Sequence, residues 1–354
     1  MSFARRTTAS TTALLALAAL AACSGNPADP SQDPGEGGAA GNELTVVTHD
    51  SFALPDELKA QFEETTGYDV TYVAPGDGGA LVNQLILTKD SPLGDVVFGV
   101  DNTFAGRAVE EGVFAPYESP ALPESAAQYA IESLTPVDMG DVCINADTQW
   151  FEEAGIEVPA TLDDLTDPAH KDLLVVSHPA SSSPGLAFLA ATVGAEGDAW
   201  PEYWDALVAN GVKVVSGWSD AYYTEFSGAD GEGPYPLVLS YATSPAFTLT
   251  EDGSASTTEA LLETCFRQVE YAGVIEGAEN EPGAREFIDF LLSPEVQASI
   301  PENMYMYPVD DEVELPADWA SFAPLSSDPI DVPADEIAAN RDQWIADWTA
   351  RVIG

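Results

Sequence analysis

The segment LTVVTHDSFALPDELKAQFEETTGYDVTYV, residues 44–73, predicts a β-strand, an α-helix and a second β-strand in direct succession. Its first and last five residues have the composition of strands. Between them, residues 55–66 place Leu58 and Phe62 on one stripe, and Gly67 follows as a C-terminal cap, so this part predicts an amphipathic helix. Strand, helix and strand in this order predict a mostly parallel sheet covered by helices.

The same alternation continues along the chain, with a helix at 80–87 and a strand at 95–99. The remaining predicted elements are, in chain order, an extended segment at 137–145, strands at 173–177, 212–216 and 237–240, helices at 184–192 and 198–209, an extended segment at 265–272, and helices at 281–292, 294–299 and 335–352. The fold class is therefore α/β. The roughly 313 residues of the folded part predict two lobes, at about 150 residues each.

The N-terminus has the charge, apolar and small-residue order of a secretory signal. Arg5 and Arg6 precede an apolar run that ends in Leu-Ala-Ala-Cys23, which resembles the bacterial lipobox. The run is too short to span a bilayer, which needs about 20 residues. The sequence therefore predicts a lipoprotein signal peptide at 1–22 and a lipid-anchored extracytoplasmic protein that begins at Cys23. An ordinary secretory signal with a chance cysteine is the alternative.

The predicted domain organisation follows from composition. Residues 23–41 are rich in Gly, Pro, Ala, Ser and acid, so they predict a disordered tether. Lobe 1 is expected at 42–137 and lobe 2 at 138–265, and 266–354 is expected to return to lobe 1 and add the C-terminal helices.

The formal net charge of −49 limits the partners of the chain. A field of this sign repels nucleic acid and draws a cationic small molecule toward a cleft. Solvation of a secreted or salt-adapted protein explains most of these carboxylates equally well. We expect a monomer that binds no nucleic acid.

Cysteine and histidine usage predicts one disulfide and no metal site. With Cys23 lipidated, Cys143 and Cys265 remain as an even pair outside the cytoplasm, which favours a disulfide. Both lie on predicted extended segments, and these segments look like the two crossings of the chain between the lobes. No cysteine–histidine group has zinc-ligand spacing.

The loops after the predicted strands are the places to look for a ligand. They are rich in hydroxyls, aromatics and acids and contain no lysine or arginine. Ser183-Pro184 and Ser244-Pro245 each predict a serine cap and a helix N-terminus, which favour an anion or hydroxyl or serve capping alone. Trp218, Tyr241 and Tyr305 are either rim packing or stacking surfaces. Asp77 is a turn former or an acceptor for a ligand amine.

Seven stretches of these loops and strands carry a family resemblance: THDSF (48–52), GDGGALVNQL (76–85), DVVFGVDN (95–102), PASSSPGL (179–186), GWSDAY (217–222), LVLSYATSPAF (237–247) and MYPV (306–309). They keep their order across nearly the whole folded part, and the chain resembles the thiamine-binding proteins of bacterial ABC transporters. The resemblance implies a two-lobed type II periplasmic-binding fold with a ligand cleft between the lobes. It also implies thiamine or its phosphates as the transported ligand, an ABC permease as the partner, no cofactor and no enzymatic activity.

The resemblance also implies a set of ligand-binding residues. Residue by residue, the contacts of the family fall on Asp77, Gly78, Ser182, Ser183, Trp218, Tyr241, Ala242, Thr243, Ser244, Pro245 and Tyr305. The chain departs from the family at His49, a site position where tyrosine is expected, and at Met139, where an aromatic is expected. Stacking on the aromatics is worth about 0.5–2 kcal/mol per cation–π contact.

Two other functions are compatible with parts of the sequence. Tyr222-Tyr223 is a tyrosine pair of the kind that ferric-ion-binding proteins of the same fold use, although hard-metal ligands around it are not evident. A hydrolase built on Ser181 to Ser183 with a histidine is a weaker alternative, because no Gly-x-Ser-x-Gly elbow is present.

The lipobox reading gives the first testable prediction. Protein extracted from membranes should have the intact mass of a chain that begins at Cys23 plus its acyl groups, because cleavage and diacylation act on the same cysteine. An unmodified soluble product that begins elsewhere would contradict it.

Overall fold

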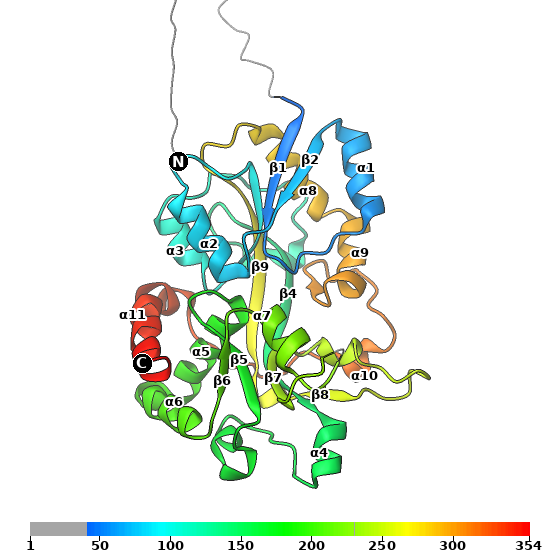
Figure 1. Cartoon of the computed structure of the whole chain (residues 1–354). Helices are drawn as coiled ribbons and strands as arrows, with labels where there is room; N and C mark the ends of the chain where they lie inside the picture. Colours follow the sequence, from blue (N-terminus) through cyan, green and yellow to red (C-terminus); the bar gives the residue numbers. More distant parts are fainter. Residues whose placement is uncertain (1–40, 230) are drawn as a thin grey trace, which may run out of the picture. The chain divides into compact units, whose positions relative to one another are not determined.

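A mixed β-sheet organises the computed structural model, which describes residues 41–229 and 231–354 (Figure 1). The strand order is β2-β1-β3-β9-β4-β7-β5-β6, and β8 and β10 also pair with β4. The strands are β1 (Glu43–Thr48), β2 (Asp69–Val73), β3 (Val96–Asp101), β4 (Thr135–Asp147), β5 (Leu174–Ser177), β6 (Lys213–Val215), β7 (Leu237–Tyr241), β8 (Thr258–Ala260), β9 (Phe266–Val274) and β10 (Tyr307–Pro308). The predicted signal peptide, Cys23 and all but the last residue of the predicted tether lie outside the described residues.

Helices follow most strands, as the alternating pattern predicts. They are α1 (Asp56–Thr66), α2 (Gly78–Leu87), α3 (Ala105–Glu110), α4 (Thr148–Ala154), α5 (Ser183–Glu196), α6 (Trp200–Ala209), α7 (Trp218–Asp220), α8 (Glu281–Leu291), α9 (Pro294–Asn303), α10 (Trp319–Phe322) and α11 (Ala334–Val352). None of the helices in the described part of the chain combines the length and the apolar character that crossing a membrane requires.

Lobe 1 is the part built on the parallel strands β2-β1-β3. Alternate residues of these strands face two separate cores, because side chains of a strand point to opposite faces. Val47 and Val97 pack on the side of α2 and α3, whereas Val46 and Phe98 pack on the side of α1, α8 and α9. The apolar stripe predicted for α1 is correct in its main member, Phe62, which is buried.

Lobe 2 is the part built on β7-β5-β6, which are also parallel to one another. Its central helix, α5, is buried over most of its length and has no polar face. α5 contacts α6, β5 and β7. Such a helix is expected only inside a covered sheet.

β4 and β9 run through both lobes as an antiparallel pair (Figure 1). β9 pairs with β3 at the lobe 1 side, and β4 pairs with β7 at the lobe 2 side. Cys143 on β4 and Cys265 just before β9 form a disulfide, so the predicted pairing is confirmed. The predicted boundaries 137/138 and 265/266 fall inside β4 and at the start of β9 and stay predictions.

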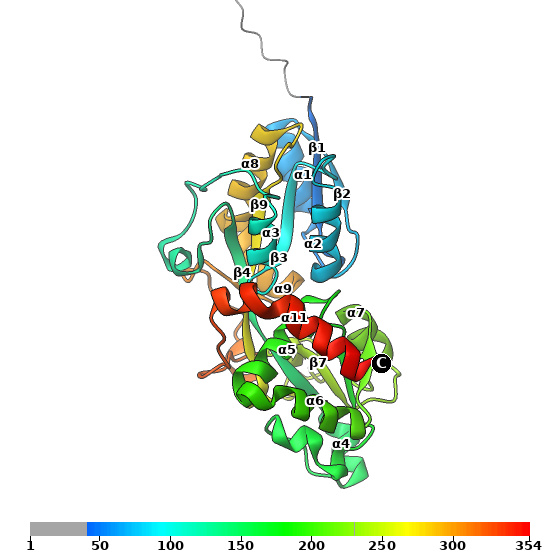
Figure 2. The same ribbon diagram turned by 90° about the vertical axis from the view of Figure 1, so that its left-hand side faces the viewer.

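The long helix α11 contacts elements of both lobes (Figure 2). Its buried Trp348 packs edge-on against Trp204 of α6 in lobe 2, with 5.3 Å between ring centroids. Its buried Arg341 lies over the ring of Phe104, next to α3 in lobe 1, at 4.7 Å. α11 is therefore a second, non-covalent link between the lobes beside the two crossing strands.

The disulfide gives a stability prediction. Replacing Cys143 and Cys265 together with alanine should lower the free energy of unfolding by about 2–4 kcal/mol, because the bond closes a long loop in the unfolded chain. The two cysteines are separated by 122 residues. Urea unfolding of both proteins measures the difference. A digest of unreduced protein should contain the linked Cys143–Cys265 peptide, and two unlinked peptides would contradict the assignment.

Candidate functional site

A cavity of about 420 Å³ lies at the junction of the two lobes. Nine of the twelve predicted ligand-binding residues line it: His49, Asp77, Gly78, Ser183, Trp218, Tyr241, Thr243, Ser244 and Tyr305. Ser182, Ala242 and Pro245 do not, and Ala242 and Pro245 instead line a smaller cavity on another side of the same loop. The loops selected from the sequence therefore meet at this cavity, and ligand contact by each residue stays a prediction.

The roles of Ser182 and Ser183 differ from the predicted ones. Ser182, not Ser183, caps α5: its Oγ accepts from the backbone N–H of Gly185 at 3.3 Å and donates to Ser177. Ser183 is the first helical residue, and its hydroxyl donates to the buried carboxylate of Asp101 in lobe 1. Both hydroxyls are therefore already engaged within the protein.

The structure also differs from the prediction at the second proposed helix N-terminus. Ser244 and Pro245 begin a single 3₁₀ turn, Ser244–Ala246, without a side-chain cap. The Ser244 hydroxyl accepts from the backbone N–H of Tyr241 and shares a hydrogen bond with Ser240. A turn of this length has too few aligned peptide dipoles to act as an anion site.

Asp77 joins the two lobes directly. Its carboxylate accepts from the N–H of Gly78 in lobe 1 at 2.6 Å and from the N–H groups of Ser183 at 3.0 Å and Trp218 at 2.9 Å in lobe 2. A carboxylate that accepts from backbone amides at the start of a helix is electrostatically favoured. The amide of Ser183 that we expected to face a ligand is therefore occupied by Asp77.

Glycines allow the lobes to approach this closely. A Cβ atom on Gly78 would collide with the Ser183 hydroxyl, and one on Gly79 would lie 2.6 Å from the backbone of Ser181. Two further bonds cross the same contact: the N–H of Ala80 donates to Ser181, and the side-chain amide of Asn83 donates to Ala180. The turn after β2 is thus a continuous interface with the start of α5.

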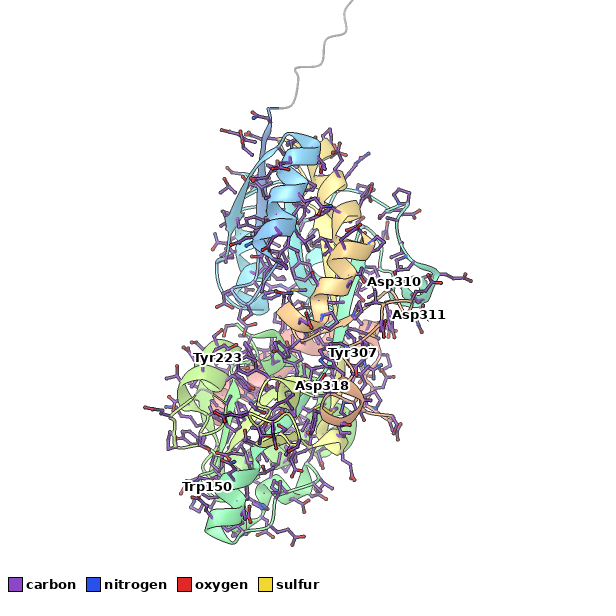
Figure 3. All side chains as sticks on the ribbon, turned by 90° about the vertical axis from the view of Figure 1, so that its right-hand side faces the viewer. Trp150, Tyr223, Tyr307, Asp310, Asp311 and Asp318 are labelled. Carbon is purple, nitrogen blue, oxygen red and sulfur yellow. A yellow bond between two sulfur atoms is a disulfide. The ribbon has the colours of Figure 1, made fainter. Side chains whose placement is uncertain are left out.

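An aromatic wall forms one side of the cavity. Trp218 stacks on Tyr222 with ring centroids 5.1 Å apart and an interplanar angle of 15°, and its Nε1–H donates to Ser240 at 2.9 Å. Tyr223 contacts Trp218 edge-on and lies on the part of lobe 2 that faces lobe 1 (Figure 3). Tyr305, at a positive φ of 53°, packs against Phe247 at another part of the lining.

Three acidic residues belong to the polar part of the lining. Asp50 and Glu270 were not predicted and join Asp77 there. Burial, with repulsion from Asp77, raises the pKa of Asp50. Burial lowers the pKa of His49, but attraction to Glu270 outweighs it and leaves the pKa above its ordinary value. The described lining contains no lysine or arginine, so the cavity favours a cation.

Glu270 is the functional candidate that the sequence reading missed. It belongs to FRQVEYAGV, a strand whose other residues are mostly apolar, and it is buried. An acid in the middle of a buried strand is costly without a partner, and this cost is the sequence signal that could have marked it. Within residues 41–229 and 231–354, no group of three His, Cys, Asp or Glu has the arrangement of a metal site.

Two lobes joined by crossing strands, with an enclosed polar and aromatic cavity between them, define a ligand-capturing binding protein. A family model described as bacterial extracellular solute-binding protein matches residues 91–331. The thiamine-binding periplasmic protein of Salmonella typhimurium is 31% identical over 318 residues, which cover 87% of this chain and 93% of that protein. The chain belongs to this bacterial extracellular solute-binding family, and its architecture is the two-lobed type II periplasmic-binding fold.

Two further relatives bear on the ligand. The solved structure of a periplasmic thiamin binding protein matches with a TM-score of 0.78 at 30% identity, covering 88% of this chain and 96% of that one. Iron uptake protein A1 of Synechocystis is 26% identical over 308 residues, which cover 81% of each chain. Relatives of this chain are thus named for thiamine binding and for iron uptake, so the lining of the cavity is the evidence that discriminates between the two ligands.

The contact made by Asp77 gives a prediction about lobe closure. Asp77→Ala should leave the lobes further apart, because the backbone amides of Ser183 and Trp218 in lobe 2 lose a charged acceptor in lobe 1, each hydrogen bond being worth about 1.5–3 kcal/mol. Small-angle scattering of ligand-free protein should show a larger radius of gyration. Asp90→Ala, at an exposed position beyond α2, is the matched control. Identical scattering curves for Asp77→Ala and wild type would contradict the assignment.

Proposed function

We propose that the protein captures thiamine in the cavity between its lobes and delivers it to an ABC transporter permease. The observation that carries the proposal is the composition of the cavity. Three carboxylates and seven aromatic side chains line it, and the described lining contains no lysine or arginine. Thiamine combines a flat pyrimidine with a ring of fixed positive charge, which matches such a lining through stacking, cation–π contact and charge.

The same lining favours thiamine over its phosphates. An anionic tail needs arginine, lysine or free backbone amides. The amides of Ser183 and Gly185 at the start of α5 are bonded to Asp77 and Ser182. A phosphate ester would therefore meet carboxylates rather than donors in the conformation described.

Iron is the second candidate ligand, since a relative of the chain is an iron uptake protein. Tyr222 is buried against Trp218 and Phe226, whereas Tyr223 is 48% exposed, and the two rings are nearly perpendicular at 85°. The hard oxygen ligands that iron(III) prefers are not grouped around this pair in the described chain. Titration with iron(III) should therefore produce no tyrosinate charge-transfer band.

Binding without turnover is part of the proposal. The hydroxyls of Ser181, Ser182 and Ser183 donate to Ser216, Ser177 and Asp101. Since these three hydroxyls have oxygen acceptors, a serine–histidine pair of the hydrolase type finds no support here. We further propose that the protein acts outside the cytoplasm as a monomer held on the membrane by lipid at Cys23.

Replacing Trp218 tests the aromatic wall. Trp218→Ala should weaken thiamine binding by about 2 kcal/mol, near thirtyfold, because stacking on a fixed cation is lost. Trp218→Phe keeps a ring but loses the indole N–H, so its loss should be smaller. Calorimetric titration of protein freed of copurified ligand measures both. Equal thiamine affinity for Trp218→Ala and wild type would show that the ligand lies elsewhere.

A further inference from the structure

Three acidic residues face one another across three neighbouring strands below the cavity. Asp101 of β3 is the register partner of Glu270 on β9, and Glu270 is the register partner of Asp138 on β4. Their exposed fractions are 0%, 6% and 0%. Like charges directly opposite each other destabilise a sheet, and burial increases the cost. The arrangement of this acid row, Asp101–Glu270–Asp138, is therefore electrostatically unfavourable if all three carboxyl groups are charged.

The three members of the acid row differ in what stabilises their charge. Asp101 accepts from the Ser183 hydroxyl and from both the N–H and the hydroxyl of Thr103. Glu270 accepts from the side-chain amide of Gln268 at 3.1 Å, and its other oxygen lies 3.5 Å from Nε2 of His49. Asp101 and Glu270 are thus both supplied with donors, as buried anions require.

Asp138 is different, because both of its carboxyl oxygens are buried without a hydrogen bond from any described residue. Burial and repulsion from Glu270 raise its pKa well above the ordinary value. Two carboxylates have no proton to share, whereas a protonated Asp138 donates one hydrogen bond to Glu270. One proton on Asp138 therefore satisfies the pair and leaves the negative charge on Glu270.

The His49 side chain can approach Glu270 only because β3 has a glycine, without a side chain, at position 99. Gly99 has a φ of +96°, at the register shift between Phe98 and Val100, and a Cβ atom there would collide with the His49 ring. The N–H of Ser51 donates to Nδ1 of His49, so the ring proton of neutral His49 is on Nε2 and faces Glu270. The imidazole thus passes β3 and lies within ion-pair distance of Glu270, with 3.5 Å between Nε2 and the carboxylate.

Other ionisable groups near Glu270 give no compensating positive charge. Tyr241 of β7 is held neutral, because burial and then repulsion from Glu270 raise its pKa well above the ordinary value. Asp50 and Asp77 add negative charge at the cavity lining. Glu270 itself lines the cavity and is the member of the acid row that a ligand reaches there.

We propose that Glu270 determines the specificity of the cavity for a fixed positive charge, and that Asp138 releases its proton to solvent when a cation binds. The inference rests on the proposed thiamine-binding function. A cation beside Glu270 offsets the cost of two adjacent carboxylates, so the ionised form of Asp138 becomes favourable. A neutral ligand of the same shape leaves the buried charge of Glu270 without a counter-ion, and such unpaired groups discriminate strongly.

The direction of the pH dependence follows from this linkage. The bound cation lowers the pKa of Asp138 relative to the ligand-free protein. Affinity therefore rises with pH between the lower pKa of the complex and the higher pKa of the free protein, and one proton is released in that range. Protonation of His49 acts in the same direction, because it adds a positive charge beside the ligand at low pH.

The test compares thiamine with its uncharged isostere, in which carbon replaces the quaternary ring nitrogen. Wild type should prefer thiamine by about a hundredfold or more, and Glu270→Gln should reduce this preference at least about tenfold, mainly by weakening thiamine. Glu259→Gln, an exposed acid on β8, is the control. Asp50→Asn tests the other newly found acid and should change the preference less.

Proton release is measured on wild type without any variant. Calorimetric titration in two buffers of different ionisation enthalpy counts the protons released. The count should be smaller in Asp138→Asn than in wild type, while thiamine is still preferred, because only the contribution of His49 remains. Asp138→Asn should also melt at a higher temperature than wild type at neutral pH, because folding of wild type has to return to Asp138 a proton that the unfolded chain has lost, whereas asparagine takes up none.

The possible failures are distinguishable. Wild type that binds no thiamine overturns the proposed function and this inference with it. Wild type that binds thiamine while folded Glu270→Gln keeps the full charge preference overturns the inference alone. If Glu270→Gln does not fold, an absence of proton release by wild type on binding thiamine overturns the inference, because the release depends on a cation beside Glu270 and Asp138.

Discussion

The antiparallel pairing of β4 with β9 is the constraint on which the rest of the structure depends. These two strands belong to both lobes, so each lobe completes its sheet with a strand that continues into the other lobe. The pair is fastened where it meets lobe 2, by the Cys143–Cys265 disulfide and by the ion pair of Arg267 with the buried Asp141. Because these links are close to the strand axes, they limit separation of the strands but not bending along them.

The contact between the lobes at the cavity differs in chemistry from the link along β4 and β9. At the mouth of the cavity, Asp77 and Ser183 connect the lobes through hydrogen bonds to backbone amides and to Asp101. Such bonds each contribute about 1.5–3 kcal/mol when one partner is charged, and water replaces them when the lobes part. The permanent links therefore lie along β4 and β9, and the reversible ones lie beside the ligand cavity, as a protein that closes on a ligand requires.

Much of this arrangement was predictable because it depends on local pattern. The helices α1, α8 and α11 are long enough to show a helical period, and the strands β1, β3 and β7 are short runs of strand-forming apolar residues. The Cys143–Cys265 pair follows from cysteine count and setting. The short helices α3 and α4 and the strands β8 and β10 were not predicted. They have too few residues to show a period, and tertiary contacts determine them.

The site features that the sequence did not predict also depend on tertiary structure. The loops selected from the sequence meet at the cavity, since strand ends meet at one edge of a sheet. The exchange of roles between Ser182 and Ser183 depends on where α5 begins, and helix ends are uncertain by one or two residues. Glu270 was missed because its importance comes from the register of β9 with β3 and β4, which places it between Asp101 and Asp138. A local sequence pattern does not determine the register between strands that are distant in the chain.

The strongly acidic surface and the acid row act on a cationic ligand at different ranges. A net charge of −49 raises the concentration of cations around the protein, but salt screens this attraction over about 10 Å at 0.1 M. Inside the cavity the described lining excludes lysine and arginine, and the charge of Glu270 acts at contact distance where salt screens little. Encounter of the protein with a cationic ligand therefore depends on the net charge of the whole chain and on ionic strength. The choice among ligands of the same shape depends on one carboxylate, whose charge is preserved by a histidine on one side and a proton on the other.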